Sequence, residues 1–217
     1  MAERTGRRAP AVFLLLLVAA PAGAVVVDRI AISVGNKVIT ESAINLRLRL
    51  TAFENGDKPD FSLAARKRAA DLLIDQRIVE REMDVGHYPR TGEDGRAPLL
   101  EDYTRSVYKG DKSVLDRALA AYQLSESDLE EDLARQADLL SFLNVRFRPA
   151  VQVSDSDIGA FFEKTIKPLK PQASLNEYRT QIEQRLAGER ANSEMEAWLK
   201  EQRKSTRIEY LEKDLAP

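Results

Sequence analysis

The sequence contains no cysteine, and only one histidine and one tryptophan, among its 217 residues. A chain without cysteine forms no disulfide and cannot be trapped by wrong pairing in an oxidising compartment. The single histidine, His87, lies in a segment rich in proline and glycine. A Ser-His-Asp arrangement needs a buried and oriented histidine. We therefore interpret His87 as a solvated loop residue and predict no catalytic residues.

Glycine-rich phosphate loops are also absent, since Gly35 and Gly56 stand alone. The net charge is −2, and no basic stripe suited to phosphate neutralisation occurs, so nucleic acid is not an expected partner. Two acidic groups, at 155–157 and 130–132, are interpreted as a helix start and a charged helical face rather than as metal ligands. We expect no cofactor and no metal.

Long apolar runs are confined to the beginning of the chain. Three arginines within residues 4–8 precede the apolar run 12–20, and a small-x-small sequence follows at 22–24. This order is typical of a secretory signal peptide, and the run covers about half of the ~20 residues that span a bilayer. We predict a signal peptide at 1–24, cleaved near Ala24, and a periplasmic protein. No later stretch predicts a stable membrane anchor.

Two short β-rich runs open the mature chain. Residues 25–34 are rich in isoleucine and valine, and a Gly-Asn pair separates them from 37–39, which is typical of a hairpin. At the other end, residues 207–211 alternate apolar and charged side chains, as an edge strand does. We predict that this strand pairs with the hairpin and brings the two ends of the chain together.

Apolar residues spaced by threes and fours predict helices through most of the remaining chain. Ser174-x-x-Glu177 is interpreted as a capping box for the last and longest helix. Residues 87–98 hold two prolines and two glycines and predict a solvated loop, and 167–171 predict a linker. The expected helices cover residues 40–55, 62–85, 99–108, 113–122, 125–147, 158–165 and 174–204. The fold class is mainly α with a small antiparallel sheet.

The order of these elements resembles the N-terminal module of the SurA-type periplasmic chaperones. The resemblance is carried by VVDRIA at 26–31, VGNKVITES at 34–42 and LLIDQRI at 72–78. The segments LSESDL at 124–129 and VSDSDI at 153–158 also lie where the family places such helix starts. The resemblance covers nearly all of the mature chain.

The resemblance implies a protein that escorts unfolded outer-membrane proteins. Many members insert a parvulin isomerase domain of about a hundred residues before the C-terminal helix, whereas only residues 166–173 fill that place here. We therefore expect no isomerase activity and no enzyme. The implied organisation is a signal peptide at 1–24, a helical chaperone module at 25–165, a linker at 166–173, and a C-terminal helix and strand at 174–217.

A holding chaperone needs apolar surface that stays accessible and is surrounded by charge. Leu50, Phe53, Tyr103 and Tyr108 lie near loop ends and are expected to be exposed contacts for unfolded polypeptides. Core packing is the alternative for each of the six candidates, and a subunit bound to one fixed periplasmic partner is the alternative function. A homodimer formed by exchange of the terminal helix also stays open. The predicted peptide-binding residues are Leu50, Phe53, Met83, Tyr103, Tyr108 and Met195.

Overall fold

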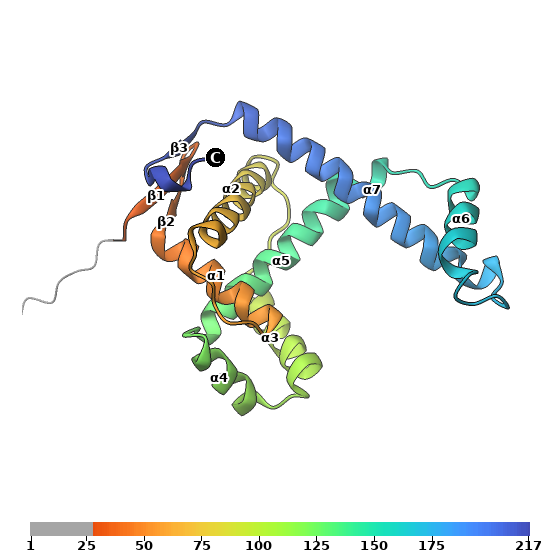
Figure 1. Cartoon of the computed structure of the whole chain (residues 1–217), viewed down its shortest axis with the longest axis horizontal. Coiled ribbons are helices and arrows are strands. Elements are labelled where there is room, and N and C mark those ends of the chain that lie inside the picture. The colour runs from red at the N-terminus through yellow and green to blue at the C-terminus, as the bar shows by residue number, and fades with distance from the viewer. Residues whose placement is uncertain (1–27) are drawn as a thin grey trace, which may run out of the picture.

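The computed structural model describes residues 28–217, and the proposed signal peptide with its cleavage site near Ala24 lies outside the described residues (Figure 1). The described chain is mainly helical and carries a three-stranded antiparallel sheet, which confirms the predicted fold class. Among residues 28–217, no helix is both long and apolar enough to cross a membrane.

The sheet joins the two ends of the described chain. Strands β1 (Ile30–Val34) and β2 (Lys37–Thr40) form the hairpin, and β3 (Ile208–Tyr210) pairs with β1 on its other edge, giving the order β2-β1-β3. Gly35 adopts a positive φ of 59° in the hairpin turn, a conformation that glycine reaches without steric cost. The prediction that the C-terminal strand pairs with the hairpin is confirmed.

Helices α1 (Glu41–Asn55) and α2 (Leu63–Val85) come after the hairpin, and their bounds agree closely with the predicted ranges. The side chains of Thr40 and Ser62 accept hydrogen bonds from backbone amides in the first turns of α1 and α2, which satisfies donors that a helix start leaves free. Gly56, with a φ of 69°, ends α1 in the left-handed conformation.

Helices α3 (Glu93–Tyr108) and α4 (Lys112–Ala121) form a pair beside α1 (Figure 1). The predicted loop at 87–98 is too long, because α3 begins at Glu93 and contains Pro98. Two acids in the first turn of α3 favour the positive end of the helix dipole. Proline in the sixth helical position removes one hydrogen-bond donor, which the buried contacts of α3 offset.

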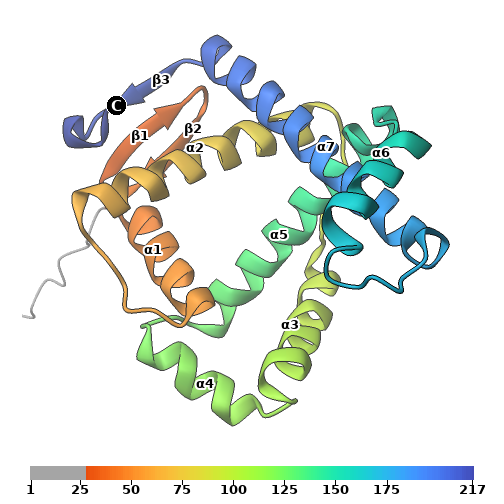
Figure 2. The same ribbon diagram turned by 45° about the vertical axis from the view of Figure 1, so that its right-hand side comes forward.

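Helix α5 (Glu126–Arg146) runs from the end of α1 to α7 (Figure 2) and is followed by a short 3₁₀ turn. Helix α6 (Asp155–Phe161) continues into a π-helical turn at 162–166. Reciprocal capping boxes form at Ser125 with Asp128 and at Ser154 with Asp157. These two helix starts match the serine and aspartate signals of the sequence.

The last helix, α7 (Leu175–Ser205), spans the molecule (Figure 1). The capping box predicted at its start does not form, because the Ser174 side chain makes no cap hydrogen bond. Its first half packs with α6 around a separate apolar cluster centred on Ile158, Phe162 and Ile182. We call this projecting pair of helices the arm; the predicted linker forms the turn at its tip.

Three further apolar clusters form the body. The first lies between the sheet, α1 and α2. The second joins the end of α1 to α3, α4 and the start of α5. The third cluster joins the end of α2, the end of α5 and the second half of α7. Trp198 packs against both the first and the third cluster. The long terminal helix is therefore anchored on the body by its second half.

Candidate functional site

Helices α1, α2, α5 and α7 line a pocket of about 410 Å³. We call these four helices the frame. Each contributes side chains to the pocket, and the loop after α2 adds Arg90. The lining residues are Arg47, Leu72, Asp75, Gln76, Val79, Glu80, Met83, Arg90, Asp132, Arg135, Gln136, Asp138, Leu139, Met195 and Leu199.

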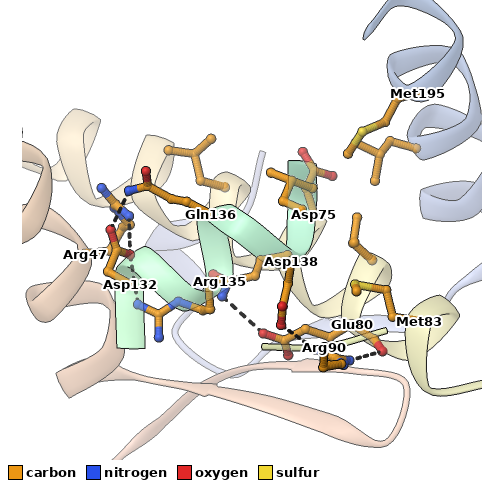
Figure 3. A pocket seen from close by; sticks show the side chains of 15 residues that line it. Arg47, Asp75, Glu80, Met83, Arg90, Asp132, Arg135, Gln136, Asp138 and Met195 are labelled. Atoms are coloured by element: carbon orange, nitrogen blue, oxygen red, sulfur yellow. Dashed lines mark hydrogen bonds and ion pairs between the residues drawn. The ribbon is translucent and has the colours of Figure 1, made fainter. Parts of the chain in front are cut away.

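Apolar side chains from three helices reach the pocket. Leu72 on α2 is 58% exposed and Leu139 on α5 is 43% exposed, so both offer apolar surface that the fold leaves uncovered. Met83 is only 2% exposed, whereas Met195 on α7 is half-buried. Figure 3 draws the two methionines at the same end of the pocket. The pocket therefore combines buried apolar side chains with accessible ones.

A buried ionic cluster lies at the other end of the pocket (Figure 3). Asp132 on α5 is 2% exposed and accepts hydrogen bonds from Arg47 at 2.9 Å, from Arg135 at 2.9 Å and from Gln136 at 2.8 Å. Arg47 also donates to Glu54 at 2.6 Å. Buried charges need such pairing to offset the loss of water. The cluster ties α1 to α5 and closes this end of the pocket.

The two carboxylates of this cluster shift in opposite directions. Burial opposes ionisation of Asp132, but Arg47 and Arg135 outweigh it and hold its pKa below the ordinary value. Burial raises the pKa of Glu54 above its ordinary value, despite the neighbouring Arg47 guanidinium. Asp132 is therefore the carboxylate that the guanidinium groups primarily neutralise.

The other acids at the pocket also have partners within the protein. Asp138 lies 3.8 Å from the Arg90 guanidinium and accepts from the Thr91 amide at 2.6 Å. Asp75 is paired with Arg203 at 2.5 Å. Glu80 is paired with Arg77 at 2.7 Å. Because these acids are neutralised internally, the ligand chemistry of the pocket is set mainly by its apolar side chains.

An aromatic cluster fixes α7 beside the pocket. The Trp198 ring lies 5.5 Å from Phe142 and 5.9 Å from Phe147, measured between centroids. The Arg146 guanidinium lies over the Trp198 ring at 5.3 Å and is paired with Glu82 at 2.9 Å. Aromatic pairs and cation–π contacts add to the energy of apolar burial. They hold the α7 wall of the pocket on α5 and α2.

The predicted peptide-binding residues fall into two groups. Leu50 and Phe53 are buried in the cluster between α1, α3, α4 and α5, so the expectation that they are exposed is wrong. Tyr103 and Tyr108 are half-buried against the same cluster, with burial raising the pKa of Tyr103 to about 12. These four side chains fill the space between packed helices, and proximity to a loop end did not leave them open.

Met83 and Met195, by contrast, both line the pocket. The accessible residues that the sequence did not single out for binding are Leu72 and Leu139. The sequence does hold a signal for Leu72. With Leu72 beside Leu73, the apolar stripe of this helix is wider than one packing face requires, so part of it should stay accessible. Leu139, which stands beside Leu140, gives the same signal on α5.

The acidic groups considered as metal ligands take structural roles. Asp157 caps α6 and contacts Arg190 at 2.9 Å, and its bonds to Ser154, followed by Arg190, lower its pKa to about 2. Asp155 is paired with Arg179 at 2.5 Å. His87 occupies an exposed turn directly after α2, with a φ of 51°. Within residues 28–217, no three potential ligands gather as a metal site would require.

The chain matches no protein-family model and no curated protein at a significant level. The volume of the pocket falls in the range of ligand sites, and its accessible leucines and paired acids suit an uncharged apolar group.

Proposed function

We propose that this chain is a periplasmic holding chaperone that binds unfolded exported polypeptides, including outer-membrane proteins, without ATP. The observation that carries the proposal is the accessible apolar surface of Leu72 and Leu139 inside a framed pocket. An unfolded client exposes apolar side chains, which gain free energy when such a surface removes them from water. The proposed binding surface does not include the residues packed where α1 meets α3 and α4, which are Leu50, Phe53, Tyr103 and Tyr108.

The energetics suit reversible binding. Each apolar side chain that a client buries contributes about 1–2 kcal/mol, so one or two side chains in the pocket give weak binding. Additional contacts along the client raise the affinity by increasing the effective concentration of neighbouring segments. Release then follows from mass action or from folding of the client itself.

The charged surroundings of the pocket support the same function. Three acids that line the pocket, Asp75, Glu80 and Asp138, are each paired with an arginine of the same chain. A chaperone whose apolar surface met another copy directly would aggregate with it. Internally paired charges therefore favour binding of exposed client side chains over self-association.

The resemblance to SurA-type chaperones in the sequence supports the holding function and not isomerisation. Residues 166–173, where many members carry a parvulin domain, form the compact turn at the tip of the arm, closed by backbone hydrogen bonds such as Lys170 to Ile166 at 2.9 Å. We propose no enzyme activity. Prolyl isomerisation of a short peptide, measured with and without the chain, should proceed at equal rates.

The proposal is tested by measuring how well variants at two exposed leucines suppress the aggregation of an unfolded client. Leu72→Asp places a charge in the pocket, whereas Leu211→Asp places one directly after β3, at a residue that does not line the pocket. Both leucines are 58% exposed, so the two variants carry matched costs to folding. We expect Leu72→Asp to weaken suppression about tenfold. Leu211→Asp should behave as the unmodified chain does.

Two clients distinguish a general chaperone from a subunit with one fixed partner. An unfolded outer-membrane β-barrel protein and an unfolded cytosolic protein should both be kept soluble by the unmodified chain. Failure with both clients, or equal effects of the two leucine variants, would overturn the proposal. Activity restricted to a single partner would favour the dedicated subunit instead.

A further inference from the structure

Sulfur is concentrated at the pocket. The chain has no cysteine and three methionines, and the two that follow Met1 are Met83 and Met195. Both line the pocket, although they come from different helices, α2 and α7. Every sulfur atom in residues 28–217 therefore belongs to a side chain at this one site (Figure 3).

The two methionines differ in access to solvent. Met83 is 2% exposed and belongs to the buried cluster at the end of α2. Met195 is half-buried and packs against that cluster from α7, at the edge of the pocket. Oxidation of methionine follows exposure of its thioether. The fold thus presents one methionine to a dissolved oxidant and protects the other.

We infer that Met195 is an oxidation site that switches off client binding by the pocket, an inference that rests on the proposed function. A peroxide transfers one oxygen atom to the Met195 sulfur, its O–O bond breaks, and the peroxide leaves as the corresponding alcohol or water. The thioether loses two electrons and becomes a sulfoxide, while the peroxide gains them. The S–O dipole makes an apolar wall of the pocket polar.

The effect on binding follows from the surroundings of Met195. Met195 packs against an apolar cluster that includes Val79 and Ala191, and their side chains offer the new oxygen no hydrogen-bond donor. A client side chain that covered the sulfoxide would remove this oxygen from water without compensation. We expect the affinity for an apolar client to fall about tenfold.

The experiment treats the purified chain with hydrogen peroxide and locates the added oxygen by peptide mass spectrometry. We expect oxidation of Met195 to precede that of Met83. Oxidised chain should lose aggregation suppression about tenfold while its unfolding curve stays unchanged. Met195→Leu keeps a similar apolar volume without sulfur, so its suppression after peroxide treatment should equal its own suppression before treatment.

Three results would overturn the inference. They are oxidation of Met83 as fast as Met195, full suppression by the oxidised chain, and loss of suppression by peroxide-treated Met195→Leu.

Binding of an apolar fluorescent dye gives a second measure of the pocket. If the untreated chain holds no client, the proposed function fails. In that case, weaker dye binding after oxidation of Met195 would still show that oxidation switches the pocket. Unchanged dye binding would show that it does not.

Discussion

Asp132 shows how a single residue shapes the pocket. It is a buried carboxylate on α5, and three donors from α1 and α5 converge on it. A carboxylate in this position costs free energy unless its partners are present, and the partners in turn need the carboxylate. The cluster therefore specifies how α1 and α5 approach each other beside the pocket.

Replacing Asp132 by asparagine should lower the free energy of unfolding by about 3 kcal/mol, because it leaves Arg47 and Arg135 without their common counter-ion. Urea unfolding followed by circular dichroism measures the change. Glu101→Gln is the control, since Glu101 is 75% exposed and pairs with the exposed Arg105. That variant should change stability by less than about 0.5 kcal/mol.

The same residue gives a pH dependence. The pKa of Asp132 is lower in the folded chain than its unfolded value of about 3.9. Its stabilising contribution is complete above the unfolded pKa and is lost as the pH falls through the lower, folded pKa. We expect acid to destabilise the unmodified chain more steeply than Asp132→Asn below about pH 4. Parallel slopes in urea unfolding at successive pH values would contradict this role.

At the residue scale, the sequence predicted the pocket only in part. The periodic pattern showed that Met83 and Met195 lie on apolar helix faces, but Leu50 and Phe53 lie on such faces too. Periodicity identifies apolar side chains without telling which neighbour covers them. Here α3, α4 and α5 cover Leu50 and Phe53, whereas nothing in the described part of the chain fully covers Leu72.

At the scale of elements, serine caps define several of the helix starts. Ser125 accepts a hydrogen bond from the Asp128 amide at 3.1 Å, and Asp128 accepts one from the Ser125 amide at 2.8 Å. Ser174 precedes α7 in a similar sequence context but makes no such bond. The two sites offer a matched comparison of the same residue type.

Ser125→Ala should lower the free energy of unfolding by about 1 kcal/mol, because the backbone amide of Asp128 in the first turn of α5 loses the Ser125 hydroxyl as its acceptor. Ser174→Ala should change it by only a few tenths of a kcal/mol, since no cap bond is lost. Thermal or urea unfolding of the two variants side by side provides the measurement. Equal losses would show that the bond at Ser125 contributes nothing.

The anchoring of α7 gives a second element-scale prediction. Trp198→Ala removes the ring that packs on Phe142 and Phe147 and should cost about 3–5 kcal/mol. Trp198→Phe keeps an aromatic ring and should cost markedly less. Urea unfolding by circular dichroism checks both variants, and hydrogen exchange of α7 amides checks the cause. A Trp198→Ala variant with unchanged α7 protection would contradict the anchor.

Element boundaries were predicted best where a chemical signal marks them. Serine, threonine and glycine at helix ends located α1, α2 and α5 closely. The start of α3 was missed because Gly95 and Pro98 suggested a loop, while burial of Leu100 and Thr104 supports a helix there. Tertiary packing overrode local preference at that point.

At the scale of the whole molecule, the sheet and α7 close the frame. Strand β3 returns the chain to the hairpin, so α7 must cross the ends of α2 and α5 on its way (Figure 1). The sequence predicted this meeting of the two ends from the alternation at 207–211. It did not predict the pocket, because a cavity depends on how four helices cross and not on any one of them.

The central claim is that unfolded polypeptides are held in the framed pocket. A photo-reactive amino acid placed at position 72 or at position 211 tests it directly, because the two leucines are equally exposed and only Leu72 lines the pocket. With an unfolded outer-membrane β-barrel protein as client, we expect strong cross-linking from position 72 and little from position 211. Equal cross-linking from both positions, or cross-linking from position 211 alone, would contradict the claim.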